Sequence, residues 1–397
     1  MIVSVPPFGF VKPSESPQTP PSRGVQIDNQ TADGITVSNT FFAATFGASG
    51  VLRSLMVRAQ SDQQDDWEAI DLSKGVPGNT FRMFDDVPLF WDAWCAEMYH
   101  LEKPVGLPTS PTSYEVVGQS PLRVTVRFHT KLSGASSVVQ TVSVSAVSPL
   151  IEFDTSVDWH ENRKFLKVFF PLSVRSESAR YHVPYGWISR PTHRNTSWDM
   201  AKFEVVGHYW ADLSQYDRGV ALINDCKYGY AVLESLMSLS LLRSSKYPDE
   251  HADMGQHSFR YALFPHHSAD LAPVINQAQA FNVPLRRFES APLAALTSPS
   301  SPWLVSHRKD ARTPSSAVIL DAIKLSEVDL TSTILRFYES LGGSTSVFLH
   351  STFKVLAAAQ CNLLEDPLHP LTVSSHGLVV GPIRFNPFEV VTVKLTL

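Results

Sequence analysis

The residues best suited to chemistry gather in one stretch, GNTFRMFDDVPLFWDAWCAEMYH, at positions 78–100. Its aspartates and tryptophans are Asp85, Asp86, Asp92, Trp91 and Trp94. Sugar sites use this combination, because an indole packs on the C–H face of a pyranose while carboxylates accept hydroxyl protons. The same composition also fits a loop with Asx-type caps and buried aromatic side chains. The stretch alone therefore leaves a carbohydrate site and a structural loop open.

A second charged stretch, residues 157–164, places an aspartate, a histidine and a glutamate close together. The zinc motif HExxH needs a second histidine at position 164, where Lys164 stands. A zinc-protease interpretation therefore fails. We expect a turn between two strands, capped by charged groups.

A third stretch, residues 189–199, surrounds Trp198 with arginines, a histidine and an aspartate and shows no strand periodicity. Its candidates for a charged pocket are His193 and Asp199, which Arg–carboxylate pairs would order. The alternative is a segment that braces one domain on another. Both interpretations stay open.

Other catalytic signatures are missing from the sequence. The remaining histidines show no metal-ligand spacing, and isolated histidines are more often structural groups. The sequence has no GxSxG nucleophile motif, no P-loop and no GxGxxG fingerprint. The residues alone indicate a soluble all-β protein, for which carbohydrate binding is one hypothesis.

Composition excludes several classes of protein. The 397 residues are 43% hydrophobic and 18% charged, which suits a globular chain. The formal charge of -5, without a long run of either sign, argues against nucleic acid or a membrane surface as partner. No stretch approaches the roughly 20 apolar residues that a membrane span requires.

The cysteines and the first residues bear on the compartment. Cys95, Cys226 and Cys361 lie far apart, which predicts neither a disulfide framework nor a zinc site and favours a reducing compartment. The opening MIVSVPPFGF lacks the pattern of a signal peptide. Both features favour a reducing compartment such as the cytoplasm.

Period-two alternation predicts the elements that position these residues. Residues 123–129 and 141–147 alternate apolar and polar side chains, as half-buried antiparallel strands do. Residues 165–170 predict a more apolar strand, and residues 41–55 a strand, a turn and a strand. Between positions 57 and 71 we expect a long surface loop. The 28 prolines and the scarcity of amphipathic helices indicate an all-β fold.

Composition breaks divide the chain into four expected segments. Residues 1–25 resemble the end of an upstream β-domain strand and a crossing, so we expect the chain to be a fragment. Residues 26–290 are expected to form a large antiparallel β-supersandwich. Residues 291–315 form a Pro/Ser/Ala-rich linker, and residues 316–397 a small C-terminal β-sandwich.

Five long motifs, in this order, resemble the C-terminal half of the family 38 α-mannosidases. They are GNTFRMFDDVPLFWDAW (78–94), VDWHENRKFLKVFFPL (157–172), RPTHRNTSWDMAKFEV (190–205), ALINDCKYGY (221–230) and LSLLRSSKYPDEHADMGQHSFRYALFPH (239–266). The last segment, up to FNPFEVVTVKL (385–395), resembles the family's terminal β-domain. The resemblance covers essentially the whole chain and is greatest to the cytosolic/vacuolar branch, which trims free oligosaccharides.

The resemblance implies a retaining glycosidase. In this family one carboxylate attacks the anomeric carbon, a second acid protonates the leaving oxygen, and a divalent metal, usually zinc, grips the mannose hydroxyls. These groups belong to an N-terminal α/β barrel and the helices after it, which this sequence does not contain. The resemblance therefore assigns no catalytic residue and no metal ligand here, and it implies zinc or another divalent metal only for the full-length enzyme. We expect the isolated chain to be inactive.

The resemblance also implies that the β half supplies the far wall of the sugar pocket and supports the barrel. Arg243 matches an arginine that reaches toward the active site in relatives, and its planar donor fork suits that role. Asp253 and Gln256 lie near it in sequence and are expected on the same wall. Sugar contact and bracing of the domain interface both stay open for Asp85, Asp86, Asp92, His193 and Asp199.

Two hypotheses from different classes follow. The first is the C-terminal half of an α-mannosidase of mannose and oligosaccharide catabolism, whose partners are a mannose-containing oligosaccharide and the missing barrel. The alternative is a stand-alone β-domain that binds glycans or a protein without catalysis. A sugar epimerase ranks below both, because only the large sandwich suggests it. We expect an exposed apolar patch within residues 78–100 where the barrel would pack, and oligomerisation stays open.

Overall fold

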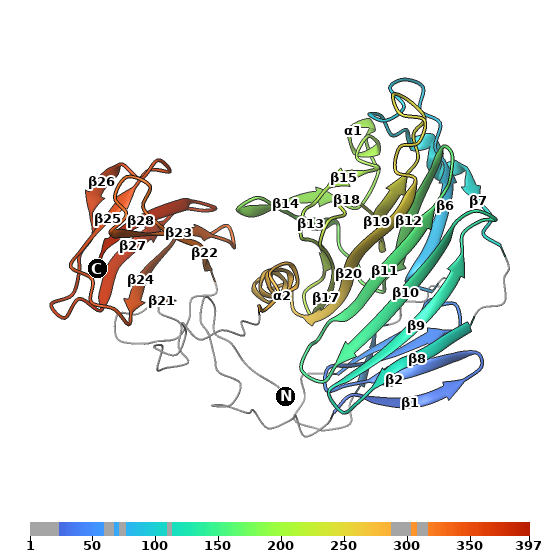
Figure 1. Ribbon diagram of the computed structural model, residues 1–397, viewed down its shortest axis with the longest axis horizontal. Coiled ribbons are helices and arrows are strands. Elements are labelled where there is room, and N and C mark those ends of the chain that lie inside the picture. The colour runs from blue at the N-terminus through green and yellow to red at the C-terminus, as the bar shows by residue number, and fades with distance from the viewer. Residues whose placement is uncertain (1–23, 59–66, 71–76, 109–112, 287–302, 308–316) are drawn as a thin grey trace. The chain divides into compact units, whose positions relative to one another are not determined.

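The computed structural model describes residues 24–58, 67–70, 77–108, 113–286, 303–307 and 317–397 (Figure 1). The upstream strand expected within residues 1–25 and most of the expected linker lie outside these residues. The chain divides into two compact units. The larger consists of Pro20–His182 and Ile188–Pro284, and the smaller contains Leu285–Leu397 together with Val183–Trp187.

Three antiparallel sheets are formed by the chain up to residue 284. The nine-stranded sheet has the order β14 (Gly186–Pro191), β13 (Ser178–Val183), β16 (Trp210–Ser214), β17 (Arg218–Asn224), β20 (Gly255–His267), β11 (Ile151–Trp159), β10 (Ser137–Ser145), β9 (Arg123–Lys131) and β8 (Ser113–Gln119). The six-stranded sheet has the order β15 (Val205–Val206), β18 (Gly229–Leu233), β19 (Leu236–Arg243), β12 (Lys164–Pro171), β6 (Thr80–Asp85) and β7 (Pro104–Val105). The five-stranded sheet consists of β1 (Gln26–Thr31), β2 (Gly34–Ser38), β3 (Phe42–Gly47), β4 (Leu52–Arg58) and β5 (Trp67–Ile70).

Three short helices complete the described part of this unit. They are η1 (Met98–Glu102), α1 (Ser197–Met200) and α2 (Ala272–Asn282). None of the helices in the described residues is long and apolar enough to cross a membrane.

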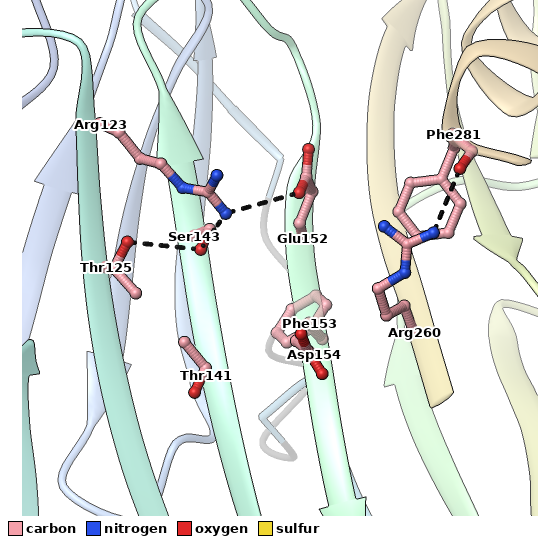
Figure 2. Close-up of a pocket in the computed structure, with 9 residues that line it drawn as sticks. All are labelled: Arg123, Thr125, Thr141, Ser143, Glu152, Phe153, Asp154, Arg260 and Phe281. Carbon is pink, nitrogen blue, oxygen red and sulfur yellow. Dashed lines mark hydrogen bonds and ion pairs between the residues drawn. The ribbon is translucent and has the colours of Figure 1, made fainter. Parts of the chain in front are cut away.

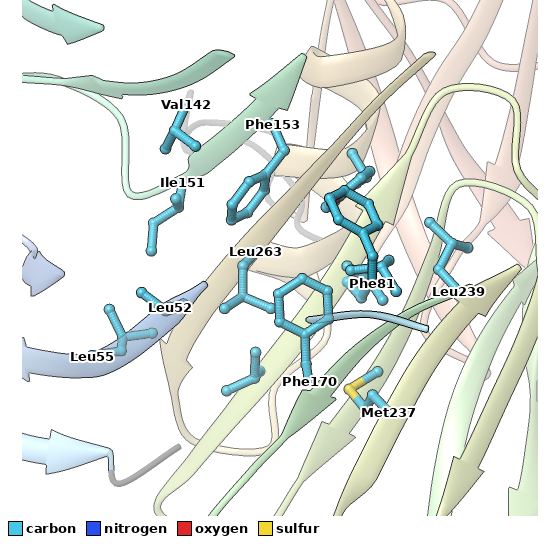
Figure 3. Close-up of a cluster of buried hydrophobic side chains, with 14 of the residues drawn as sticks. Leu52, Leu55, Phe81, Val142, Ile151, Phe153, Phe170, Met237, Leu239 and Leu263 are labelled. Atoms are coloured by element: carbon cyan, nitrogen blue, oxygen red, sulfur yellow. The ribbon is translucent and has the colours of Figure 1, made fainter. Parts of the chain in front are cut away.

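The inner faces of the three sheets share one hydrophobic core. Alternation along β10 and β11 sends every second side chain inward, as the period-two pattern predicts. Figure 3 shows the meeting of the sheets: Phe153 of β11 lies 6.1 Å from Phe170 of β12 between ring centroids. Leu52 and Leu55 of β4 join the same cluster and are fully buried. Burial of this area is the main favourable contribution to folding of the unit.

A closed polar network crosses the core. The Asn79 amide donates to Gln140 (2.6 Å), and the Gln140 amide donates to Thr155 (2.9 Å) and to the Tyr261 hydroxyl (2.8 Å). The Tyr261 hydroxyl donates back to Asn79 (2.7 Å). Because every amide proton and the hydroxyl have partners, the network avoids the cost of a buried unsatisfied group.

One glycine is required by the geometry beside this network. Gly50 has a φ of +81° at the turn between β3 and β4. A Cβ there would lie 3.0 Å from the Phe128 ring, and the Gly50 carbonyl accepts from Asn79. A side chain at this position would be strained both by the left-handed backbone and by the contact.

The smaller unit contains a β-sandwich. One sheet has the order β21 (Trp303–Ser306), β24 (Thr345–Ser351) and β27 (Val379–Phe385). The other has the order β22 (Val318–Leu325), β23 (Ser332–Glu339), β28 (Val390–Thr396), β25 (Ala357–Cys361) and β26 (Pro367–Pro370). The apolar side chains of both sheets enclose a separate core.

The prediction of an all-β protein, with a large antiparallel supersandwich and a small terminal sandwich, is confirmed. Two features differ from the expected elements. β5 lies within the stretch 57–71 that was expected to be a surface loop. β21 lies within the stretch 291–315 and pairs with β24 of the terminal sandwich.

Candidate functional site

The candidate site is formed by four segments at one end of the large unit, here called the loop end: residues 86–97, 160–163, 192–204 and 244–254 (Figure 1). Backbone hydrogen bonds join three of them. The Asp86 N–H donates to the Arg163 carbonyl and the Arg163 N–H donates to the Ser244 carbonyl, both at 2.8 Å. These bonds hold segments that are far apart in sequence at fixed positions.

Arg243, the last residue of β19, is bonded to the first loop-end segment. Its guanidinium forms an ion pair with Asp86 at 2.7 Å and also donates to the Cys95 carbonyl at 2.7 Å. The Asp86 carboxyl is 3% exposed, and burial raises its pKa while the Arg243 charge opposes that rise. A planar fork can satisfy a carboxylate and a carbonyl at the same time, which an ammonium group does less well.

Asp92 joins the same segment to two neighbouring segments of the loop end. Its carboxylate accepts the backbone N–H of Lys246 and lies 3.8 Å from an Arg163 nitrogen. The Asp92 carbonyl is 3.4 Å from the Arg243 guanidinium. The structure therefore brings three of the sequence candidates, Asp86, Asp92 and Arg243, into one cluster that fixes the path of residues 86–97.

Backbone strain occurs at three positions of the loop end. Trp91, Arg163 and Asp253 have φ values of +51°, +51° and +58°, in the left-handed region that costs a non-glycine residue about 1–3 kcal/mol. At Trp91 the strained turn is held because its carbonyl accepts from the N–H groups of Trp94 (2.7 Å) and Cys95 (2.9 Å). Strain of this kind persists where surrounding contacts fix the backbone.

His100 of η1 is 2% exposed and packs between aromatic rings. Its ring centroid lies 5.0 Å from Phe165, 5.5 Å from Phe84 and 6.2 Å from Phe203. Nδ1 donates to the Glu97 carbonyl at 2.6 Å. Burial, with help from the Lys167 charge, lowers the pKa of His100 to about 4, so the ring is neutral at neutral pH.

Lys167 and Glu204 attach the fourth segment to the six-stranded sheet. The Lys167 side chain is fully buried in β12, and its ammonium donates to Glu204. The other Glu204 oxygen accepts from the Ser240 hydroxyl of β19. The sequence motifs did not predict this pair, although a lysine inside the apolar run Phe165–Phe170 is the kind of signal that marks a buried charge.

The other sequence candidates lie outside the Arg243 cluster. Asp85 pairs with Lys164 at 2.7 Å, across the β6–β12 ladder. His193 lies 3.7 Å from Asp199. The Thr196 hydroxyl caps α1 by accepting the Asp199 N–H and donates to the Asp199 carboxylate, which lowers the pKa of that carboxyl.

Asp253 and Gln256 are exposed at the start of β20. The Asp253 carbonyl accepts from His257 at 2.7 Å, and Gln256 pairs with Asp158 of β11 in the ladder. Within the described ranges, no hydrogen bond or ion pair joins either side chain to Arg243. A place for them on the same sugar-facing wall stays a proposal.

Large apolar side chains cover the loop end. Leu89, Phe90, Trp91 and Trp94 are 67%, 72%, 72% and 89% exposed. The interpretation of residues 78–100 as a loop with buried aromatic side chains is therefore wrong for both tryptophans. We call these four residues the loop-end apolar surface. Four large exposed apolar side chains within six residues are a candidate for a surface that another molecule or domain covers.

The described residues contain no group of three or more His, Cys, Asp or Glu side chains placed to hold a metal ion. The donors at the loop end do not fit a zinc site, because Asp86 and Asp92 are already bound to Arg243, Arg163 and Lys246. No chemical step is assigned to a metal held by these residues.

Comparison with known families decides the membership of the chain. Residues 37–251 match the glycosyl hydrolases family 38 C-terminal domain. The chain belongs to glycosyl hydrolase family 38. Residues 317–393 match the family 38 C-terminal beta sandwich domain, so both units carry family 38 sequence. The resemblance inferred from the motifs is confirmed.

Relatives show how much of a family 38 protein is present. Human alpha-mannosidase 2C1 is 39% identical over 404 residues, which cover 100% of this chain and 37% of the relative. The Saccharomyces cerevisiae alpha-mannosidase is 33% identical over 87% of this chain and 33% of its own length. The chain thus spans about a third of the length of the curated relatives it matches.

A solved structure supports the fold. An alpha-mannosidase from Enterococcus faecalis V583 superposes with a TM-score of 0.66 over 93% of this chain and 43% of that chain, at 16% identity. At that identity the likeness shows the fold alone. The family 38 fold therefore applies to both units of this chain.

Proposed function

We propose that this chain is the C-terminal half of an α-mannosidase that hydrolyses mannose-containing oligosaccharides. In this proposal it supports the catalytic barrel and forms the far wall of the sugar pocket. The nucleophile, the general acid and the zinc or other divalent metal belong to the barrel. By analogy with its relatives, we place the enzyme in the cytoplasm or the vacuole.

The observation that carries the proposal is the loop-end apolar surface on a fixed backbone. Trp91 and Trp94 expose most of their indole area, yet Arg243, Asp86 and Asp92 hold the segment that presents them. An exposed tryptophan on an ordered segment favours binding, because little conformational entropy remains to be lost on contact. The loop end is thus suited to dock against a large apolar partner.

The candidate site residues divide into two roles under this proposal. Arg243, Asp86 and Asp92 position the docking segment, and the part of the Arg243 side chain that is exposed, 22%, faces outward for a polar contact. Asp85, His193, Asp199, Asp253 and Gln256 are proposed as polar groups of the rim or the sugar wall. The segment boundaries at 25, 290 and 315 are kept as a proposal, with β21 assigned to the terminal sandwich.

The direct test is association of this chain with the separately produced N-terminal half of a family 38 relative. We expect a complex by analytical ultracentrifugation, and Trp91→Ala/Trp94→Ala should weaken it at least tenfold. The matched control is Tyr216→Ala, because Tyr216 is 94% exposed on the β16–β17 turn, at the other end of the sheet. A double variant that binds as tightly as the wild type contradicts the proposed docking surface. A clean monomer that binds neither the barrel half nor a hydrophobic dye favours the alternative, an independent β-domain.

A further inference from the structure

A hollow lies on the outer face of the nine-stranded sheet, within the large unit. Its volume is about 130 Å³. Figure 2 shows its lining side chains on β9, β10, β11, β20 and α2. The residues around it are Arg123, Thr125, Thr141, Ser143, Glu152, Asp154, Arg260 and Phe281, together with Phe153, whose ring lies in the core on the other face of the sheet. We call this hollow the outer-face groove.

Strand register explains why the sheet is hollow here. Thr141 of β10 lies between Arg127 of β9 and Asp154 of β11, and Asp154 lies opposite Arg260 of β20. Outward side chains of β10 are short at Thr141 and Ser143. The hydroxyl groups of Thr141 and Ser143 therefore lie lower on the sheet surface than the longer side chains of the neighbouring strands.

The groove offers hydrogen-bond donors and acceptors on opposite sides. Arg123 donates to the Ser143 hydroxyl at 2.8 Å and lies 4.0 Å from Glu152, with 59% of its side chain exposed. Across the groove, Arg260 pairs with Asp225 at 3.1 Å and stacks on Phe281 at 4.8 Å.

One group in the groove stands out because it lacks a partner. Asp154 is exposed, and within the described residues its carboxylate makes no hydrogen bond or ion pair, although Arg260 faces it in the ladder. Arg260 is committed to Asp225 instead, and Arg127 to Glu115 at 2.7 Å. The Asp154 carboxylate is thus an acceptor available to a ligand.

The groove contains both acidic and basic side chains, and this mixture favours a ligand without net charge. An anion would meet Asp154 and Glu152, and a cation would meet Arg123 and Arg260, so either net charge is disfavoured. A ligand with many hydroxyl groups satisfies carboxylate, guanidinium and threonine partners together, because each hydroxyl both donates and accepts. A neutral polyhydroxylated ring therefore suits the polarity of the groove.

We propose that the outer-face groove binds one neutral hexopyranose unit as a non-catalytic subsite. The choice of a mannoside as its natural occupant rests on the proposed function. Asp154 accepts two vicinal hydroxyls, Arg123 donates to a third, and Thr141 forms the floor. Phe281 is buried at 6% exposure and offers no open ring face for stacking, so we expect weak binding.

Ligand-observed saturation-transfer NMR on the purified chain tests this with methyl α-D-mannopyranoside as probe. We expect saturable transfer to the sugar. Thr141→Phe fills the groove and should abolish saturation transfer to the sugar. Asp154→Asn removes a charge-assisted acceptor and should weaken mannoside binding about tenfold. The matched control is Val139→Phe, the next outward position on β10, which should bind like the wild type.

The outcomes separate this inference from the proposed function. Absence of transfer, or equal transfer to the Thr141→Phe variant, overturns the groove as a sugar site without affecting association with the barrel half. Tighter binding of inorganic phosphate or glycine than of the mannoside overturns the assignment to a neutral sugar. Loss of binding in both phenylalanine variants would indicate a damaged sheet. In that case Asp154→Asn with an unchanged melting temperature is the test: weaker mannoside binding supports the sugar site, and unchanged binding overturns it.

Discussion

Arg243 and Asp86 lie 157 residues apart in sequence, and their side chains form an ion pair at 2.7 Å at the loop end. The pair joins the last residue of β19 to the residue that follows β6. Because the guanidinium also holds the Cys95 carbonyl, one side chain fixes both ends of the segment that carries Trp91 and Trp94.

Arg243→Ala should lower the free energy of unfolding by about 3–5 kcal/mol, because it leaves the buried Asp86 carboxylate without its partner. Arg243→Lys should cost less, since the charge remains while the planar fork is lost. Denaturant unfolding measures both. Arg175→Ala, at an exposed arginine, is the matched control and should leave stability within about 0.5 kcal/mol of wild type. Equal stability of Arg243→Ala and Arg175→Ala would contradict the role of the pair.

Lys167→Met should be strongly destabilising, by about 3–5 kcal/mol, because Glu204 keeps a largely buried charge without a counter-ion. The double change Lys167→Met/Glu204→Gln should recover part of this loss, since the unpaired charge is gone. Thermal unfolding gives the energies, and limited proteolysis within residues 192–204 reports release of the segment. A double variant less stable than the single one would show that Glu204 is held by other groups.

Gln140→Leu should lower stability by about 1–3 kcal/mol, because Asn79, Thr155 and Tyr261 each lose a partner in the core. The control is Thr141→Val, the next residue of β10, whose side chain points outward. Denaturant midpoints of the two variants compare an inward with an outward polar position. A Gln140→Leu variant as stable as the control would mean that the network is not needed.

The free energy of unfolding should decrease as the pH is lowered, because His100 is buried in its neutral form. The pKa of His100 is lowered to about 4 in the folded state, against 6.5 when the ring is exposed. The unfolded chain therefore binds a proton between pH 6.5 and 4 that the folded chain excludes, so stability is lost as pH falls through this window. The full difference corresponds to about 3 kcal/mol. In His100→Phe this part of the slope should vanish, and urea unfolding from pH 7 to 4 measures it. An unchanged slope would show that His100 titrates normally.

Much of the fold could be predicted from the sequence because alternation alone specifies half-buried strands. Residues 123–129 lie in β9 and residues 165–170 in β12. Of the strand predicted at 141–147, residues 141–145 lie in β10, which ends at Ser145. β5 was missed because its four residues follow a polar run with no alternation to mark them. The expected position of Arg243 near carboxylates came from the family resemblance, since periodicity cannot bring residues 86 and 243 together.

The functional details were harder to predict for a physical reason. Exposure of Trp91 and Trp94 depends on a left-handed turn and on long-range contacts, and local composition predicted burial equally well. The outer-face groove depends on the register of four strands, which a single sequence does not specify. Lys167 was visible as a charge in an apolar strand, but its partner Glu204 was not.

The most direct test of the central claim is release of mannose from an aryl α-mannoside, with zinc and cobalt supplied in separate assays. The account predicts no turnover by this chain alone and turnover when the N-terminal half of a family 38 relative is added, above the level of that half by itself. Turnover by the chain alone would contradict the account, because it would place catalytic groups within these residues.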